Sequence, residues 1–254
     1  MTKESHVTNP PSITLYGVMS PNVLKVLILL EELALPYRLR YVNLFKGEQF
    51  SPEFLRLNPL GKVPVLIDDR LSQPLAESGA ILIYLAEQTG QFLPASGSAR
   101  YEVLQWLMVQ MSSVGPLLGQ FTHFSLLPAG NEPYAHGRYR ELAKRLYGQI
   151  NERVAGRAWL AGNDYSIADI ATFPWGEYLD RHGFDQNDYP ALMQWREKIN
   201  ARTAVQRAKA AFVEAYGAPS AQSLGSATAE DLDRFFGRSK DMPQQDFSAV
   251  TRLK

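Results

Sequence analysis

The chain has 254 residues, of which 45% are hydrophobic and 20% are charged, as is usual for a globular protein with one large domain or two smaller ones. Lys plus Arg and Asp plus Glu are equal at 26 each, so the charge gives no reason to expect nucleic acid or an acidic membrane surface as partner. The absence of cysteine excludes disulfides, thiolate metal sites and a nucleophilic thiol of the protein's own.

Signals for export, membrane insertion and metal binding are also lacking. Residues 1–11 are polar and do not form a secretory signal, and no run approaches the roughly 20 apolar residues of a membrane span. The four histidines are scattered without metal-ligand spacing, at His6, His123, His136 and His182. We therefore expect a cytoplasmic protein without a metal; the lack of cysteine agrees with a reducing compartment.

The first part of the chain predicts a sheet layered with helices. Strand-like residues at 12–17 are followed by Pro21, which suits the first turn of a helix, and by an apolar helical face over residues 23–33. Further strands are expected at 37–44, 63–68 and 71–75, with a helical turn at 52–57 and a helix at 80–89. This β-α-β-α-β-β-α order over residues 12–93 predicts an α/β domain.

One proline is difficult to place in this scheme. Pro64 stands near the start of a strand that should be central, where a missing N–H group is poorly tolerated. A cis peptide bond between Val63 and Pro64 would direct the Val63 backbone out of the sheet, whereas a trans bond would suit an edge strand. The sequence leaves both alternatives open.

After a small-residue linker at 94–98 the chain changes character. Helical patterns over residues 100–118, 133–154, 167–181 and 190–215 predict an all-helical domain at 99–216. Ser166 and Asp169 form a capping-box pattern, whose expected role is local folding. Residues 217–254 are polar and predict a tail that wraps over the domain or is partly disordered, and four apolar side chains indicate some docking: Leu232, Phe235, Phe236 and Phe247.

The first candidate site residues are Ser20 and Asn22, which flank Pro21 at the start of the first helix. A helix N-terminus offers free N–H groups and a positive dipole end. A hydroxyl and an amide at this point can donate hydrogen bonds to a thiolate and lower its pKa. The alternative is that Ser20 is simply an N-cap.

Two further stretches could bind other parts of the same ligand. The Val63 backbone could pair with an extended peptide as an added strand would, and Lys62 could neutralise a carboxylate. Ser78 and the amides of the next helix can hold a carboxylate, while Glu77 can bind an ammonium group. The alternatives are a solvated lysine and a capped helix start.

Taken together, these three stretches complement a ligand that carries a thiol, a central peptide group, an ammonium and a carboxylate. Glutathione is such a ligand. Gln49 lies in a segment where a loop could cover it.

At this point the chain resembles the glutathione transferase superfamily over about residues 13–212. The resemblance is carried by residues 62–64, by Ser78 within the segment 77–81, and by the helix start at 166–170. It implies a thioredoxin-like N-terminal domain, an all-helical C-terminal domain, a cis proline at Pro64, and a homodimer with its active site between the domains.

In detail the chain is most similar to the bacterial nu class, near the yeast nitrogen-regulator branch. The segments that carry this similarity are residues 20–22, 46–54, 115–120 and 134–139. Ser20 replaces the threonine usual in that class and keeps the hydroxyl, whereas Val23 replaces a common glycine. The class is implied to bind two glutathiones, or glutathione disulfide, and to reduce disulfides.

The resemblance also implies a role for each site residue. Ser20 and Asn22 would donate hydrogen bonds to the glutathione sulfur, and Arg138 would reach a glutathione carboxylate, including across the dimer. The tripeptide itself would be held by Gln49, Lys62, Val63, Glu77 and Ser78. An alternative for Arg138 is a surface pair with Glu141 on the same helix. His123 and Phe124 are weaker candidates for a second-ligand pocket, with packing as the alternative.

Three hypotheses follow for the function. The first is glutathione-dependent reduction of a small disulfide, because thiol–disulfide exchange requires a thiolate and this chain has to obtain it from glutathione. The second is conjugation of glutathione to a small electrophile. The third is a non-catalytic, glutathione-binding regulatory protein on the same fold.

Overall fold

The first domain has the order of elements that the sequence predicts. A computed structural model describes residues 12–126, 132–239 and 241–242. The predicted β-α-β-α-β-β-α order is confirmed, whereas the arm at 1–11 and Phe247 lie outside the described residues. The elements are β1 (Ile13–Gly17), α1 (Pro21–Glu32), β2 (Tyr37–Tyr41), the short 3₁₀ helix η1 (Glu48–Phe50), α2 (Pro52–Leu57), β3 (Val65–Asp68), β4 (Leu75–Ala76) and α3 (Ser78–Thr89).

The four strands form one mixed sheet in the order β2-β1-β3-β4. β1 runs parallel to β2 and antiparallel to β3, and β4 pairs antiparallel with β3. Pro64 therefore directly precedes a central strand. The Val63–Pro64 peptide bond is cis, which decides between the two alternatives and confirms what the resemblance implies.

The two faces of the sheet are covered by different helices. Ile13, Leu15 and Leu66 belong to the large core that also contains the buried side chains of α1 and α3. Val65, the neighbour of Leu66, points to the opposite face and packs with Phe54 of α2, because side chains alternate along a strand. The sheet is thus enclosed on both faces.

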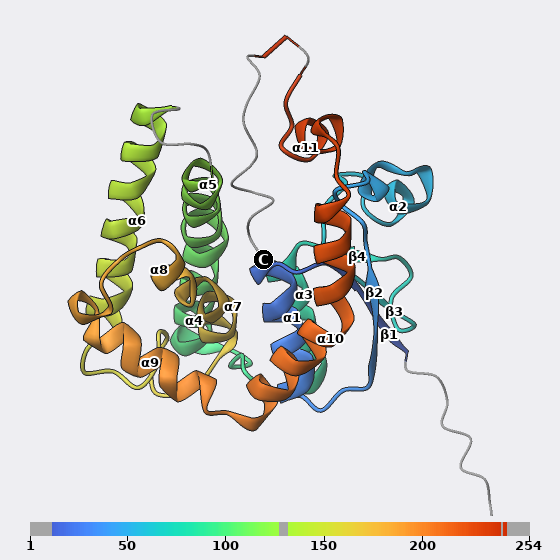
Figure 1. Cartoon of the computed structure of the whole chain (residues 1–254). Helices are drawn as coiled ribbons and strands as arrows, with labels where there is room; N and C mark the ends of the chain where they lie inside the picture. The colour runs from blue at the N-terminus through green and yellow to red at the C-terminus, as the bar shows by residue number, and fades with distance from the viewer. Residues whose placement is uncertain (1–11, 127–131, 240, 243–254) are drawn as a thin grey trace, which may run out of the picture.

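The second part of the chain is helical, as predicted. Figure 1 shows helices α4 to α9 gathered on one side of the molecule and the sheet on the other, with α1 and α3 between them. The helices are α4 (Gly97–Val109), the π-helical turn η2 (Gln110–Val114), α5 (Gly115–Ser125), α6 (Pro133–Val154), α7 (Ile167–Gly176), α8 (Tyr178–Arg181), α9 (Pro190–Asn200), α10 (Thr203–Gly225) and α11 (Ala229–Phe235), with a 3₁₀ turn η3 (Gln186–Asp188) before α9. None of the described helices is both long and apolar enough to cross a bilayer.

Two of the predicted helices are each divided into two in the structure. The single helix expected over 190–215 is wrong, because Arg202 has an extended backbone and separates α9 from α10. The guanidinium of Arg202 binds the Glu32 carboxylate of α1 at 2.5 and 2.8 Å, an interdomain contact that helical periodicity does not reveal. The expected helix at 167–181 is likewise divided, at Glu177.

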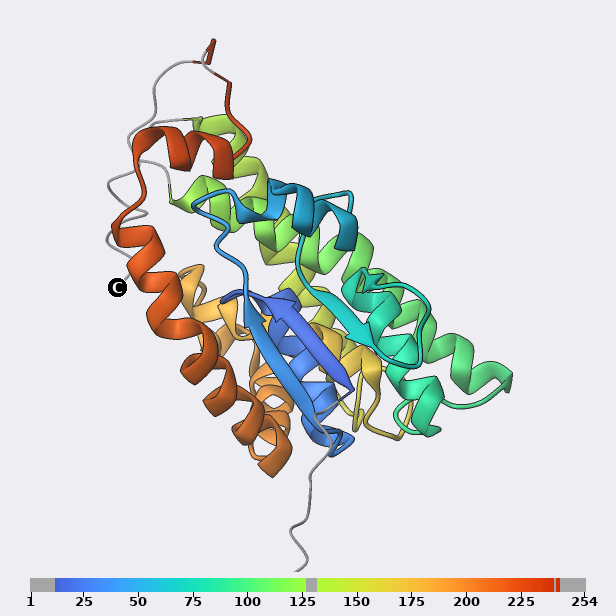
Figure 2. The same cartoon turned by 90° about the vertical axis from the view of Figure 1, so that its right-hand side faces the viewer.

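Helix α10 also continues past residue 217, where the sequence predicts the start of a polar tail. It runs to Gly225 with Pro219 inside it, although a proline removes one helical hydrogen bond. The Tyr216 hydroxyl donates to the Leu15 carbonyl at 3.3 Å, and the Tyr41 hydroxyl donates to the Pro219 carbonyl at 3.3 Å. These contacts hold α10 along the β2 edge of the sheet, as Figure 2 shows.

The capping box at the start of α7 is present and has a second role. Besides its contacts to Ser166, the buried Asp169 carboxylate accepts hydrogen bonds from the Leu160 N–H and the Trp195 indole N–H, both at 2.9 Å. One carboxylate therefore ties α7 to the preceding loop and to α9. Local folding is thus only part of what Asp169 does.

We expect Asp169→Ala to lower the free energy of unfolding by about 3 kcal/mol, because it leaves the buried N–H groups of Leu160 and Trp195 without acceptors. Ser166→Ala removes the cap hydroxyl and its hydrogen bond to Asp169 but leaves the Leu160 and Trp195 acceptor in place, and should cost about 1 kcal/mol. Urea denaturation of both variants measures the difference. Equal losses would show that Asp169 acts only as a cap residue.

Candidate functional site

Five of the eight predicted site residues line one cavity of about 420 Å³ between the two domains. They are Asn22, Lys62, Val63, Glu77 and Ser78. The opposite wall comes from η2, α5 and α7, and the residues that complete the lining are Lys25, Asn58, Pro64, Gln110, Met111, Gly115, Pro116, Gly119, Gln120 and Trp175. The three sequence stretches that predict a common ligand therefore meet in space.

Ser20 is the N-cap of α1, and its hydroxyl oxygen accepts from the Val23 N–H at 3.3 Å. This use of the oxygen leaves the hydroxyl hydrogen available to a ligand. Ser20 lines a neighbouring, largely apolar cavity of about 510 Å³, together with Phe45, Leu224 and Phe235. The first turn of α1 thus presents one candidate donor to each cavity.

The amide of Asn22 is held in one orientation by a residue that sequence reasoning missed. The Trp175 indole N–H, which can only donate, approaches the Asn22 Oδ1 atom at 3.4 Å. This contact assigns the oxygen to Trp175 and leaves the NH₂ group of Asn22 to donate elsewhere. Trp175 lies on α7, more than 150 residues from Asn22, and no spacing in the sequence connects the two.

The loop before β3 is organised by another side chain that was not predicted. The buried Asn58 donates to the Lys62 carbonyl at 2.8 Å and accepts from the Leu60 N–H at 3.0 Å. These two bonds fix the backbone between Asn58 and Val63. The exposed Lys62 side chain stands at the rim of the cavity.

At the start of α3, Glu77 and Ser78 have different environments. Glu77 has φ +67° and makes no side-chain cap bond, a backbone conformation that residues with a side chain rarely adopt. Ser78 is buried as the first residue of α3. An exposed carboxylate therefore stands next to a buried hydroxyl and the free N–H groups of a helix start.

Gln49, Arg138 and Ser20 are not among the residues that line the 420 Å³ cavity. Gln49 is buried in η1, and its Oε1 atom has no hydrogen-bond partner within the described residues. Arg138 lies exposed on α6. The two weaker candidates pack against aromatic rings, His123 against Phe236 with ring centroids 5.0 Å apart and Phe124 on Tyr139 at 5.4 Å.

Sequence reasoning also missed a charged group in the cavity wall. Lys25 is fully buried and donates to the Gln110 side-chain oxygen at 2.7 Å. Burial lowers the pKa of Lys25 to about 7, and the nearby Glu77 carboxylate acts in the opposite direction. The signal was available, because Lys25 is the one charged residue in the apolar run at 23–30.

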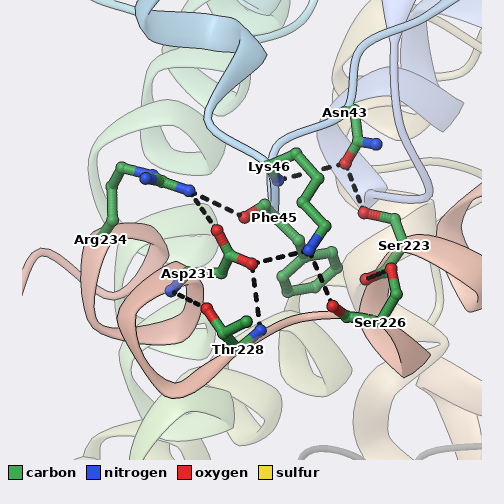
Figure 3. Close-up of polar contacts among 8 residues, drawn as sticks. All are labelled: Asn43, Phe45, Lys46, Ser223, Ser226, Thr228, Asp231 and Arg234. Atoms are coloured by element: carbon green, nitrogen blue, oxygen red, sulfur yellow. Dashed lines mark hydrogen bonds and ion pairs between the residues drawn. The ribbon is translucent and has the colours of Figure 1, made fainter.

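The segment that leads to Gln49 is fastened to the C-terminal helices by contacts that we call the C-terminal clasp. Lys46 donates to the Asp231 carboxylate and to the Ser226 carbonyl, both at 2.7 Å. Asn43 accepts from Ser223, as Figure 3 shows. The eight residues of the clasp are Asn43, Phe45, Lys46, Ser223, Ser226, Thr228, Asp231 and Arg234.

Asp231 is the central acceptor of the clasp. The hydrogen bond from Lys46, followed by those from Thr228, holds the pKa of the Asp231 carboxyl well below its usual range. Arg234 binds the other oxygen of Asp231, and its guanidinium also reaches the Phe45 carbonyl at 3.5 Å. With the rings of Phe45 and Phe235 4.5 Å apart, α11 closes one side of the apolar cavity.

Comparison with known proteins gives matches along most of the chain. The glutathione S-transferase N-terminal domain family matches residues 11–87, and the C-terminal domain family matches residues 103–203. The disulfide-bond oxidoreductase YfcG of Escherichia coli K12 is 45% identical over 201 residues, which cover 77% of this chain and 94% of that protein. Helix α11 and all of α10 after Thr203 lie beyond the two matched domains.

Two solved structures are similar in fold and sequence. A glutathione transferase family member from Pseudomonas fluorescens pf-5, with two glutathiones bound, has a TM-score of 0.72 at 41% identity and covers 80% of this chain and 94% of that chain. A glutathione transferase from Pseudomonas putida, with one glutathione disulfide per subunit, has a TM-score of 0.74 at 36% identity and covers 80% and 93%. Within the described residues, no group of three or more His, Cys, Asp or Glu could hold a metal.

We expect Asp231→Ala to loosen the segment that carries Gln49. Amide hydrogen exchange over residues 43–50 should accelerate roughly fivefold. A surface ion pair contributes little to the free energy of global unfolding, but this one restrains the local opening of residues 43–50. Asp233→Ala is the matched control, since Asp233 pairs with Arg238 and not with that segment. Equal exchange in both variants would contradict a role for the clasp in holding residues 43–50.

Proposed function

This chain belongs to the glutathione transferase superfamily, and on that premise we propose that it is a glutathione-dependent disulfide reductase whose reacting sulfurs are those of bound glutathione. The Trp175–Asn22 contact carries the proposal. It leaves an amide NH₂ group free at the N-terminus of α1, in a cavity that also offers groups for both ends of a tripeptide. The similarity to YfcG, which is named a disulfide-bond oxidoreductase, supports the same activity.

The first requirement of the reaction is a thiolate. The amide of Asn22, the hydroxyl of Ser20 and the free N–H groups of α1 would donate to the glutathione sulfur and lower its pKa. Because the chain has no cysteine, these donors replace an enzyme thiol by tuning the sulfur of a bound molecule.

The reaction then consists of two exchanges. The thiolate of one glutathione attacks a sulfur of the substrate disulfide, which forms a mixed disulfide and releases one substrate thiolate. The thiolate of a second glutathione attacks the glutathione sulfur of the mixed disulfide, which releases the other substrate thiolate and forms glutathione disulfide. The substrate gains two electrons from two glutathiones, and the two thiol protons are taken up by the leaving thiolates.

The remaining site residues would hold the tripeptide. The Val63 backbone would pair with the central peptide group, and Lys62 would neutralise a carboxylate at the cavity rim. Ser78 and the α3 amides would bind the other carboxylate, with Glu77 on the ammonium group. Gln49 would cover the ligand, and Arg138 would reach it from a second copy of the chain in a homodimer.

Conjugation to a small electrophile is the second candidate, and one observation favours it. The cavity beside Ser20 is largely apolar and is closed by Phe45, Leu224 and Phe235, which suits an apolar second substrate. A small disulfide with apolar groups would fit the same surface. We propose the cytoplasm as the location for either activity, because glutathione keeps thiols reduced there.

We expect Ser20→Ala and Asn22→Ala each to lower kcat for the reduction of 2-hydroxyethyl disulfide by about tenfold to a hundredfold. Each variant loses a donor to the sulfur, and one unit of thiol pKa is worth a factor of ten in thiolate. The exposed Asn187→Ala variant is the matched control and should keep full activity. A wild-type protein that fails to reduce this disulfide with glutathione would overturn the proposed activity.

Trp175→Phe tests the orientation of the Asn22 amide separately. It removes the indole N–H but keeps most of the packing, so kcat should fall several-fold while the apparent pKa of the bound thiol rises. Both quantities come from the pH profile of turnover at saturating glutathione. An unchanged profile would show that the contact with Trp175 does not set the function of Asn22.

A further inference from the structure

Lys25 is a fully buried lysine that the reaction described above does not use. It lies on α1 one helical turn after Asn22, on the side that lines the 420 Å³ cavity. Its ammonium donates to the Gln110 side-chain oxygen at 2.7 Å and contacts the Met111 sulfur at 3.6 Å. A lysine is almost never fully buried unless a partner compensates its charge, so we expect an anion to bind close to this amine.

The structure around Lys25 is built by a helix irregularity. Gln110 and Met111 belong to the π-helical turn η2, and such turns are frequent at functional sites. Gly79 allows Met111 to approach α3, because a Cβ atom there would meet the Met111 side chain at 3.0 Å. The turn thus brings a polar oxygen and a polarisable sulfur to the amine without supplying a full negative charge.

Lys25 lies close to the proposed binding site for a ligand carboxylate. The Ser78 hydroxyl approaches the Met111 sulfur at 3.8 Å, and the Lys25 amine approaches the same sulfur at 3.6 Å. The hydroxyl and the amine therefore flank one atom. A carboxylate held by Ser78 and the α3 amides would lie within strong electrostatic range of the amine.

Two other charged side chains line the cavity with Lys25: Glu77 and the exposed Lys62 at the rim. Glu77, at the N-cap of α3, is the charged group that acts on it. Gln110 and Met111 from η2 and Trp175 from α7, which line the cavity with it, carry no charge. Burial lowers the pKa of Lys25 to about 7, with Glu77 opposing, so the amine is largely neutral above pH 7 until a further anion arrives.

We propose that Lys25 is the electrostatic partner of the glutathione α-carboxylate that binds at Ser78, and that it takes up a proton from solution when this carboxylate binds. The proposal rests on the proposed function, since that function supplies the ligand. Glu77 and Lys25 then form a pair of opposite charges for the zwitterionic end of the ligand. Binding of that end becomes dependent on pH and selective for a carboxylate next to an ammonium group.

The test uses S-methylglutathione, because this probe has no thiol that could titrate. Calorimetric titration at pH 8 in two buffers of different ionisation enthalpy gives the number of protons taken up on binding. We expect uptake of roughly 0.4 proton by the wild type, because a rise of about one unit from a pKa of about 7 leaves half of the Lys25 amines protonated at pH 8. Lys25→Gln, whose amide still donates to Gln110, should take up none. Lys25→Met serves as a second uncharged variant if the glutamine variant folds poorly.

A second ligand distinguishes the contribution of the α-carboxylate to binding from that of the rest of the ligand. At pH 6 the wild-type amine is charged, and Lys25→Gln should bind S-methylglutathione about tenfold more weakly. This factor corresponds to a rise of about one unit in the pKa of Lys25 when the ligand binds. The analogue that lacks the α-carboxylate of the γ-glutamyl group should bind to both proteins equally. Exposed Lys144→Gln, on α6, is the matched control and should behave as wild type.

The outcomes distinguish the two proposals. Equal proton uptake and equal affinity in wild type and Lys25→Gln would overturn the role of Lys25 and leave the proposed function standing. A wild type that does not bind S-methylglutathione at either pH would overturn both.

The free protein gives an independent measurement. The pKa of Lys25 is lower in the folded than in the unfolded state, so the folded state binds fewer protons between about pH 7 and 10.5 and wild-type stability rises with pH in this window. The Tm of Lys25→Gln relative to wild type should therefore fall between pH 6 and pH 9. A difference that does not change with pH would indicate that Lys25 has only a packing role.

Discussion

Helix α1 is buried on nearly all sides, and the candidate site depends on this burial. It packs against α3 within its own domain and against α7 and α10 of the helical part, and residues 23–30 are buried without interruption. A helix so enclosed has little freedom to rotate or shift, because protein interiors are close-packed. Its first turn therefore presents Ser20 and Asn22 at fixed positions, and its second turn fixes Lys25.

Two cavities of different character meet at this first turn. The cavity that contains Asn22 carries both charges and hydrogen-bonding groups, whereas the one beside Ser20 is largely apolar. A peptide with a sulfur at its centre suits the first cavity, and the apolar part of a second substrate suits the other. In the proposed function, a protein without cysteine acts through positioning and charge: it supplies donors at the glutathione sulfur and opposite charges at one end of the ligand.

Helices α10 and α11 pack against the first domain and contribute to the apolar cavity. α10 lies along the β2 edge of the sheet, and the C-terminal clasp joins α11 to the segment that precedes Gln49. The same helices contribute Leu224 and Phe235 to the apolar cavity. Apart from Thr203, both helices lie beyond the two matched family domains.

Local signals in the sequence determined much of the protein. The order of strands and helices follows from side-chain periodicity, the capping box from Ser166 and Asp169, and the proposed ligand chemistry from three short stretches around Ser20, Val63 and Ser78. The lack of cysteine fixed the source of the reacting sulfur. These features depend on residues that are near one another in the chain, so a short window of sequence is enough to reveal them.

Only the tertiary structure decided what distant residues do to one another. Trp175 orients the Asn22 amide, the π turn brings Gln110 to Lys25, and Arg202 ends a helix by pairing with Glu32. None of these pairs has a spacing that a sequence pattern could reveal, since each joins residues 85 or more positions apart. The burial that shifts the pKa of Lys25 arises in the same way, because it exists only once helices from both parts of the chain have closed around α1.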